Sequence, residues 1–213
     1  MSTIAIIDYG MGNLHSIAKA LEHVAADARV RVSADADDIL AAERVVFPGV
    51  GGIAHCMQEL ARTGLDEVVR RAVVDRPVLG ICLGMQALLD HSEENGGTPC
   101  LGLVPGEVRR FAEPLLDDAG RRLKVPHMGW NQVHQQPHPL WQGIEQDSRF
   151  YFVHSYYADP ADPGHIAATT EYGGRFCCAL ARENLFAVQF HPEKSQHAGL
   201  RLLENFSRWD GRA

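Results

Sequence analysis

The segment best suited to chemistry is a cysteine between two glycines, Gly80-Ile81-Cys82-Leu83-Gly84. It follows an apolar stretch and precedes a helical pattern, which is the context of a nucleophile elbow, a sharp strand-to-helix turn that exposes a reactive side chain. The helix N-terminus favours the thiolate, and the N–H of Leu83 is placed to stabilise an oxyanion. The alternative is a core cysteine among packing glycines, but the strand–turn–helix context favours a nucleophile.

A thiol nucleophile needs a nearby base, and His191 is the best candidate among eleven histidines. It ends the apolar stretch 185–190 and continues as Pro192-Glu193. Proline keeps the preceding residue extended, and alternate residues of an extended chain point the same way, so Glu193 can orient the imidazole. A chance turn at a strand end is the alternative, and the elbow motif disfavours it. Nothing in the sequence orients the rings of His15, His23, His55, His91, His134, His138, His165 or His197.

Two glycine-rich turns follow predicted strands. Pro48-Gly49-Val50-Gly51-Gly52 can aim backbone N–H groups at an anion, as a phosphate cradle or as the second half of an oxyanion hole, and turn type does not decide between them. No Gly-Lys-Ser/Thr follows, so it is not a Walker loop. The earlier turn, Tyr9-Gly10-Met11-Gly12-Asn13, lacks the third glycine of a dinucleotide-binding loop. The first of these turns and the elbow both lie at carboxyl ends of strands, the ligand side of an open α/β sheet.

Composition limits the partners and cofactors that the chain can use. The net charge is −7 and basic residues are not clustered, so nucleic acid and anionic lipid are not expected partners. No apolar run reaches the ~18 to 20 residues of a membrane helix. Five cysteines without a C-x-x-C motif predict free thiols and a cytoplasmic location. His134 and His138 have ligand spacing, but prolines interrupt the segment and no cysteine is near, so we expect no metal and no cofactor.

The elements that must position these residues alternate in the first half of the chain. Strands are predicted over 3–8, 29–33, 44–47 and 77–81, and helices over 14–24, 53–60 and 83–89. Such alternation predicts an α/β fold with an open, twisted, mostly parallel sheet and helices on both faces.

The second half differs. Strand patterns over 150–157, 165–170, 176–182 and 185–190 are joined by short links, which predict an antiparallel extension of the sheet. A closing amphipathic helix is predicted over 198–209. No linker or repeat divides the chain, so we expect one domain over 1–213.

The Cys82 elbow followed far downstream by His191-Pro192-Glu193 resembles the class I (triad) glutamine amidotransferases, whose fold is flavodoxin-like. Further segments, in order along almost the whole chain, resemble the glutaminase subunits of imidazole glycerol phosphate synthase. They are Asp8–Leu14, Pro48–Gly51, Pro126–Asn131, Val153–Tyr156 and His191–Ser195.

This resemblance implies that Cys82, His191 and Glu193 form a triad that hydrolyses L-glutamine to glutamate and ammonia through a thioester. It implies an oxyanion hole from the Leu83 N–H and a flexible Val50–Gly51 peptide. The residues that it implies for glutamine binding are Gly49, Gln86, Glu94, Ser155 and Tyr156. Glu94 also makes physical sense, because the α-ammonium of the substrate needs a carboxylate.

The family passes its ammonia through a protected channel to a cyclase subunit, a (β/α)8 barrel in a heterodimer. That subunit makes imidazole glycerol phosphate and aminoimidazole carboxamide ribonucleotide in histidine biosynthesis. A dry route is reasonable, because ammonium, the main form in neutral water, is no nucleophile. We expect the acceptor site on another chain, since 213 residues are too few for a second enzyme. The resemblance also implies a docking face that includes Asn13, Trp130, Asn131 and Lys194. The alternative interpretations are that Trp130 is a core aromatic residue and that Lys194 is a solvated surface charge.

Three other functions compete with this one. The first is a glutaminase of the same class that feeds pyridoxal phosphate, guanylate or anthranilate synthesis, which the Gly-Met-Gly-Asn and Gly-Trp-Asn segments disfavour. The second is a free-standing cysteine hydrolase for peptides or esters, which would need an open groove and no partner. The third is a binding module with a vestigial triad, which the intact Cys82, His191 and Glu193 disfavour.

Overall fold

Five parallel strands form the centre of the sheet in a computed structural model that describes residues 2–212. Their spatial order is β2 (Ala28–Ser33), β1 (Ser2–Ile7), β3 (Arg44–Gly49), β4 (Val78–Cys82) and β14 (Leu185–Val188). Parallel strands of this kind are covered on both faces, and four of the five are therefore largely apolar along their whole length. The exception is β2, which lies at the edge and is only partly buried.

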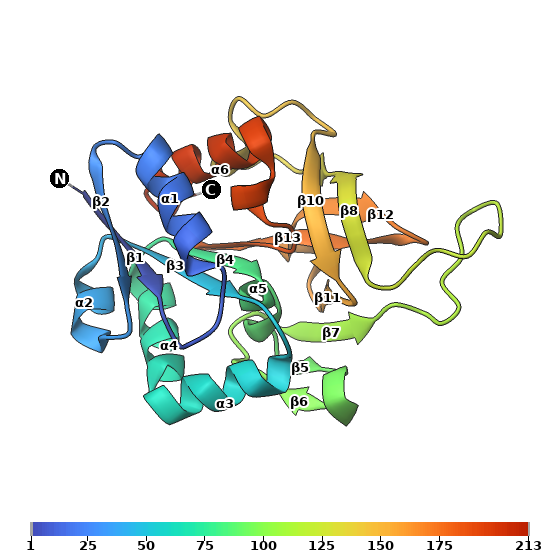
Figure 1. Cartoon of the computed structure of the whole chain (residues 1–213), viewed down its shortest axis with the longest axis horizontal. Coiled ribbons are helices and arrows are strands. Elements are labelled where there is room, and N and C mark those ends of the chain that lie inside the picture. Colours follow the sequence, from blue (N-terminus) through green and yellow to red (C-terminus); the bar gives the residue numbers. More distant parts are fainter. Residues whose placement is uncertain (1, 213) are drawn as a thin grey trace.

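Helices cover both faces of this sheet (Figure 1). One face carries α1 (Leu14–Val24) and α6 (Gln196–Arg208), which pack against each other. The other carries α2 (Ala36–Ala41), α3 (Ile53–Thr63), α4 (Leu65–Asp75) and the short α5 (Leu83–Ala87). Successive side chains of β1 point to opposite faces of the sheet, so Ile4 and Ile6 pack in the core beneath α1 and α6, while Ala5 and Ile7 pack in the core beneath the other helices.

Antiparallel strands extend the sheet beyond β14. The next strands are β13 (Arg175–Arg182), β11 (Tyr156–Pro160) and β7 (Gly106–Arg110), with β12 (Ile166–Glu171) also paired to β13. Short strands β5 (His91–Ser92), β6 (Thr98–Pro99) and β9 (His134–Gln135) complete it. Single 3-10 turns lie at Glu94–Gly96, Pro139–Trp141, Pro163–His165 and Pro192–Lys194.

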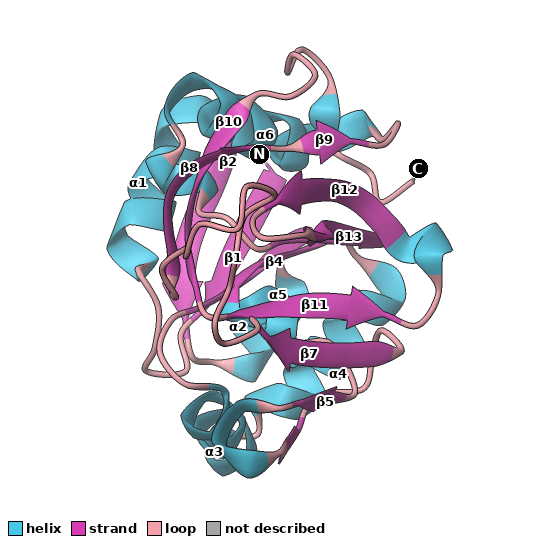
Figure 2. Cartoon of the chain, turned by 90° about the vertical axis from the view of Figure 1, so that its right-hand side faces the viewer, coloured by secondary structure: helices cyan, strands magenta, loops and turns pink. Residues whose placement is uncertain are grey.

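A second, two-stranded antiparallel sheet consists of β8 (His127–Gln132) and β10 (Arg149–His154). Figure 2 shows these strands running across the direction of β11, β12 and β13. No helix in residues 2–212 is both long and apolar enough to cross a membrane.

The α/β fold with a mostly parallel sheet is confirmed, but three element predictions were wrong in detail. The expected strand 150–157 breaks at Ser155, because β10 leaves for the second sheet before β11 begins. The expected antiparallel strand 185–190 ends at Val188, and it is also parallel to β4, so it belongs to the centre of the sheet. The helix expected over 83–89 ends at Ala87, and backbone N–H groups of 101–104 bond to the carbonyls of 87–89.

A very tight backbone contact lies behind the elbow. A Cβ added at Gly84 would lie 2.0 Å from the carbonyl oxygen of Phe47, so β3 and α5 approach as closely as a glycine permits. At Gly80 an added Cβ would lie 2.9 Å from the Cβ of Ala187 on β14. The two glycines of the elbow thus let β4 and α5 pack directly against both neighbouring strands.

We predict that Gly84→Ala lowers the free energy of unfolding by about 3 kcal/mol, because backbone must move to admit one methyl group. Urea unfolding followed by circular dichroism measures the change. Gly52→Ala is the matched control: its Cβ would lie 3.5 Å from the nearest atom and its φ is negative, so the loss there should stay below about 1 kcal/mol. Equal losses at both positions would contradict the close-contact account.

Candidate active site

The sheet topology brings three loops to the carboxyl end of β4. Cys82 ends that strand and pairs in register with Gly49 at the end of β3, while Ile81 pairs with Val188 at the end of β14. The glycine-rich loop after β3 and the segment after β14 that carries His191 therefore reach the thiol from opposite sides. Carboxyl ends of adjacent parallel strands form the ordinary ligand site of such sheets.

Cys82 has the strained backbone of a nucleophile elbow. Its φ of 55° and ψ of −110° lie outside the regions that a residue with a side chain prefers. Such strain costs of order 1–3 kcal/mol and persists only where the surroundings hold it, typically at functional sites. The residue is 7% exposed, so little of it is open to solvent.

His191 and Glu193 form a buried pair beside the thiol. Nδ1 of His191 lies 3.0 Å from Oε1 of Glu193, and both side chains are almost wholly buried. The backbone N–H of His191 donates to the carbonyl of Tyr151 (2.9 Å), and the Ser195 hydroxyl donates to the carbonyl of His191 (2.6 Å). The ring is therefore fixed at its backbone by β10 and at Nδ1 by the carboxylate.

The second ring nitrogen of His191, Nε2, is buried and has no hydrogen-bond partner of good geometry in residues 2–212. Burial by itself lowers the pKa of His191, but the neighbouring Cys82 thiol and Glu193 carboxylate outweigh it and raise the pKa to about 10. The ring therefore takes up a proton readily and faces the thiol with the nitrogen that Glu193 leaves unused. This is the geometry that a cysteine nucleophile and its base require.

Asn13 lies at the triad carboxylate. Its Nδ2 donates to Oε1 of Glu193 at 3.4 Å, although the sequence suggested only a place near a docking face. The bond comes from the turn after β1 and reaches the same carboxylate oxygen that His191 contacts. The docking role of Asn13 stays a prediction.

A cavity of about 340 Å³ opens at the thiol. Nine of the residues expected at the catalytic centre line it: Val50, Gly51, Cys82, Leu83, Gln86, Glu94, Ser155, Tyr156 and His191. Lys194 lines it too, together with Pro126, Val153 and His154. Such a volume suits a small molecule better than a polypeptide segment.

Gly49 does not line the cavity but supports its wall. A Cβ there would lie 2.6 Å from the hydroxyl of Tyr9 and 2.9 Å from the Cβ of Leu83. The Tyr9 hydroxyl donates to the carbonyl of Pro48 (2.9 Å) and accepts from the thiol of Cys56 (3.5 Å). This anchor holds the start of the Val50–Gly51 loop against the elbow. Tyr9 had no role assigned from the sequence.

Glu94 also holds that loop. Its Oε2 accepts from the backbone N–H of Ile53 (2.9 Å), the first residue of α3. A carboxylate at a helix N-terminus is favourable, because the unpaired N–H groups there carry partial positive charge. Glu94 thus has a structural bond as well as a place on the cavity wall.

Gln189 is a site residue that the sequence analysis missed. It is fully buried, and its Nε2 donates to the Cys82 sulfur at 3.8 Å. Its Oε1 accepts from Nε2 of Gln86 (2.9 Å), which also donates to the carbonyl of Tyr156 (3.0 Å). Both amide protons of Gln86 are used, so its oxygen is the atom left to meet a ligand. No local signal pointed to Gln189, because its role depends on a contact with Cys82, 107 residues away in sequence.

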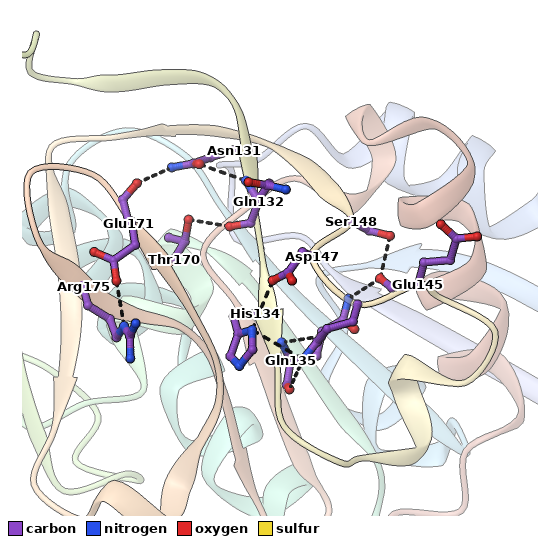
Figure 3. Close-up of polar contacts among 11 residues, drawn as sticks. Asn131, Gln132, His134, Gln135, Glu145, Asp147, Ser148, Thr170, Glu171 and Arg175 are labelled. Carbon is purple, nitrogen blue, oxygen red and sulfur yellow. Dashed lines mark hydrogen bonds and ion pairs between the residues drawn. The ribbon is translucent and has the colours of Figure 1, made fainter.

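Two expectations about the docking residues and histidines need correction. Trp130 is 41% exposed, so the alternative of a core aromatic is wrong. His134 does have a partner that orients its ring, because Nδ1 lies 3.1 Å from Oδ1 of Asp147 (Figure 3). Asp147 is thirteen residues away in sequence, and the pairing of β8 with β10, in which Gln132 lies opposite Arg149, brings the two segments together. Within residues 2–212 no group of three His, Cys, Asp or Glu side chains could hold a metal ion.

Solved structures share this fold. PurLQS from Thermotoga maritima superposes with a TM-score of 0.70 at 16% identity, covering 96% of this chain and 97% of that one. A protein described as a glutamine amidotransferase gives the same TM-score and identity over 96% of this chain and 99% of its own. At such identities the likeness concerns the fold alone.

The fold and the thiol site are those of the class-I glutamine amidotransferases, whose family model matches residues 5–208. The chain is 64% identical over 212 residues to imidazole glycerol phosphate synthase subunit HisH of Methylococcus capsulatus, covering 99% of this chain and 98% of that one. It is 59% identical to the HisH subunit of Pseudomonas putida over the full length of both. The chain therefore belongs to the class-I glutamine amidotransferases and, within them, to the HisH family. The resemblance found in the sequence is confirmed.

We predict that a neutral alkylating reagent near neutral pH modifies Cys82 at least about tenfold faster than any other cysteine. Burial raises the pKa of Cys56 to about 11 and those of Cys100 and Cys177 to about 12, and it also raises the pKa of Cys178 well above its ordinary value. Cys82 instead faces the cavity beside a basic imidazole. Peptide mass spectrometry over time measures the rates. The fast phase should vanish in Cys82→Ala, and faster labelling of Cys100 would contradict the assignment.

Proposed function

We propose that this chain is the glutaminase subunit of imidazole glycerol phosphate synthase, a cytoplasmic enzyme of histidine biosynthesis. It hydrolyses L-glutamine with Cys82, His191 and Glu193 and delivers the ammonia to a cyclase subunit. The observation that carries the proposal is the strained Cys82 on the wall of a small cavity, next to a buried His191–Glu193 pair. Membership of the HisH family supports the choice of substrate and pathway.

The first half-reaction uses the thiol as nucleophile. His191 takes the thiol proton on Nε2, and the sulfur attacks the side-chain carbonyl carbon of glutamine. A tetrahedral oxyanion forms. The imidazolium then gives its proton to the amide nitrogen, the C–N bond breaks, and ammonia leaves behind a γ-glutamyl thioester. Glu193 stabilises the imidazolium throughout and holds the ring in place, as the carboxylate does in other triads.

The second half-reaction returns the enzyme. His191 Nε2 takes a proton from water, and the hydroxide attacks the thioester carbonyl. Collapse of the second tetrahedral intermediate breaks the C–S bond, the sulfur recovers the proton, and glutamate leaves. The sum is glutamine plus water giving glutamate plus ammonia.

The oxyanion of both intermediates is stabilised by the N–H groups of Leu83 and of the Val50–Gly51 peptide. Support comes from the contact between their segments, since Gly49 lies directly against Leu83. Gly51 has a φ of 92°, where a side chain would be strained, so this peptide has conformations open to it that others lack. Donors aimed at developing charge are commonly the largest single contribution to such catalysis.

The remaining cavity residues bind the amino acid part of glutamine. The oxygen of Gln86 and the carboxylate of Glu94 are acceptors for the α-ammonium group, and Ser155 and Tyr156 line the same cavity. A cavity of only about 340 Å³ favours this substrate over the peptides that a free-standing cysteine hydrolase would take.

The cyclase docks on the surface beside the cavity. Trp130 and Met128 project from β8 with 41% and 66% of their areas exposed, an unusual pair for a free surface. Trp130 packs edge-on against Tyr151 (centroids 6.1 Å apart), and the Lys194 ammonium lies 5.9 Å from the centre of the Tyr151 ring. Lys194 also lines the cavity, so this surface adjoins the site where ammonia is made. Asn13 and Asn131 complete the proposed face.

We predict that Cys82→Ala abolishes glutamine hydrolysis while the variant still binds the cyclase, because only the nucleophile is lost. Glu193→Gln should lower kcat roughly 10³–10⁴-fold with KM changed less than about threefold, since it leaves the imidazolium unsupported. Coupled glutamate dehydrogenase assays and size-exclusion chromatography with the cyclase measure the two properties. Hydrolysis retained by Cys82→Ala would refute the nucleophile, and a vestigial triad would show no hydrolysis in the wild-type complex with the cyclase and its ribonucleotide.

We predict that the isolated chain hydrolyses glutamine very slowly and that the cyclase with its ribonucleotide raises kcat at least about 100-fold. The reason is that the Val50–Gly51 peptide must turn its N–H toward the oxyanion, and the partner docks beside it. Turnover is measured with the chain alone, with cyclase, and with cyclase plus ribonucleotide. Equal rates under all three conditions would refute the coupling.

A further inference from the structure

Two buried histidines that the proposed mechanism does not use lie in contact beside the cavity, and one of them, His154, forms part of its wall. Nδ1 of His127 on β8 is 2.9 Å from Nε2 of His154 at the end of β10. Nδ1 of His154 is 2.8 Å from the carbonyl oxygen of Tyr156, and Nε2 of His127 is 3.3 Å from Nδ2 of Asn131. The four residues form a continuous hydrogen-bonded chain from the second sheet to the cavity wall.

The donor and the acceptor of every bond in this hydrogen-bonded chain can be assigned from the groups at its two ends. A carbonyl oxygen only accepts, so His154 carries its proton on Nδ1. Burial lowers the pKa of His154 to about 3 and that of His127 to about 4, so both rings are neutral and hold one proton each. Nε2 of His154 is then bare, which places the proton of His127 on Nδ1 and leaves its Nε2 to accept from Asn131.

The other end of the chain independently requires the same direction. The Asn131 Oδ1 accepts from the backbone N–H of Gln132 (2.8 Å), and its Nδ2 donates to the carbonyl of Glu171 (2.8 Å), as Figure 3 shows. The amide is therefore oriented by β8 and β12 with its donor toward His127. Two unconnected sets of contacts thus agree on one polarity, and no other arrangement of protons satisfies both.

The hydrogen-bonded chain continues from the Tyr156 carbonyl to the Cys82 thiol. The Tyr156 carbonyl that His154 holds also accepts from Gln86, and Gln86 bonds to Gln189, which donates to the Cys82 sulfur. Aromatic rings surround the imidazoles and exclude water. Phe152 stacks on His127 with centroids 4.8 Å apart, Tyr172 covers its other side at 4.0 Å, and Phe111 lies 5.3 Å from His154.

We propose that His127 and His154 are positioning residues for glutamine hydrolysis. They fix the Tyr156 carbonyl, and through it the Gln86 and Gln189 amides at the Cys82 sulfur, in an arrangement that depends on the orientation of Asn131. This inference rests on the proposed function for its kinetic consequence, but the proton arrangement itself does not. Neither histidine touches the reacting atoms.

Nitrogen-15 NMR of the full chain tests the proton arrangement without any activity. Both rings are expected to be neutral with the proton on Nδ1, the minor tautomer of free histidine in water, with assignment by His127→Phe and His154→Phe. Asn131→Asp replaces the donor by an anionic acceptor, so His127 should gain a second proton on Nε2 while it keeps the proton on Nδ1 that His154 accepts. A proton on Nε2 of either ring in the wild-type chain, or an unchanged His127 in Asn131→Asp, would overturn the proposal.

Kinetics of the complex with the cyclase test the consequence. His154→Phe keeps a ring of similar shape among aromatic neighbours but loses the bond to Tyr156, and we expect KM for glutamine to rise about tenfold while kcat changes less than about threefold. His154→Asn keeps a donor toward Tyr156 and should restore KM to within about threefold of the wild type. His138→Phe is the matched control, because His138 is also held beside aromatic rings, Phe186 and Trp209, but outside the chain. That control should leave both constants unchanged.

The outcome for the positioning role can be distinguished from the outcome for the proposed function. A KM in His154→Phe equal to that of the wild type, or a His154→Asn variant no better than His154→Phe, would overturn the positioning role. A wild-type complex that hydrolyses no glutamine would refute the proposed function instead. The NMR result would still decide whether the hydrogen-bonded chain has the inferred arrangement of protons.

Discussion

The left-handed backbone of Cys82 is the constraint on which the rest of the site depends. A residue with a side chain holds that conformation only if its surroundings leave no alternative. Here β4 is clamped between β3 and β14, and Gly84 lies against the Phe47 carbonyl. The same close packing that enforces the strain also brings the loop after β3 and the histidine after β14 to the sulfur. The contacts that stabilise this part of the fold are therefore the same contacts that position the groups around the sulfur.

Much of the fold and of the candidate site could be predicted from local sequence. The triad follows from two short motifs, because an elbow needs small neighbours and a His-Pro-Glu turn sets its own geometry. The parallel sheet follows from alternating strand and helix patterns. These features are local: each is decided by residues within a few positions of one another, and the carboxyl ends of parallel strands then meet at one edge whatever the details.

Features that depend on distant contacts were not predictable in this way. The break at Ser155 has no local signal, and it arises because β10 pairs with β8 rather than with the main sheet. Gln189 and His154 gain their roles from bonds to Cys82 and Tyr156 that no pattern announces. Their neighbours are set by the antiparallel half of the fold, where pairing order is not encoded by periodicity. The partner of His134 was missed for the same reason.

The end of β14 has a consequence for how far this protein can vary. Gln189 bonds to the Cys82 sulfur and His191 lines the cavity at that sulfur, while Phe190 between them is fully buried in the core. An insertion or deletion of a single residue there would displace the buried phenyl ring and move the amide and the imidazole away from the sulfur together. We therefore expect length changes in homologous chains to avoid this stretch and to collect instead in the exposed loop over 116–124, whose length has no bearing on either group.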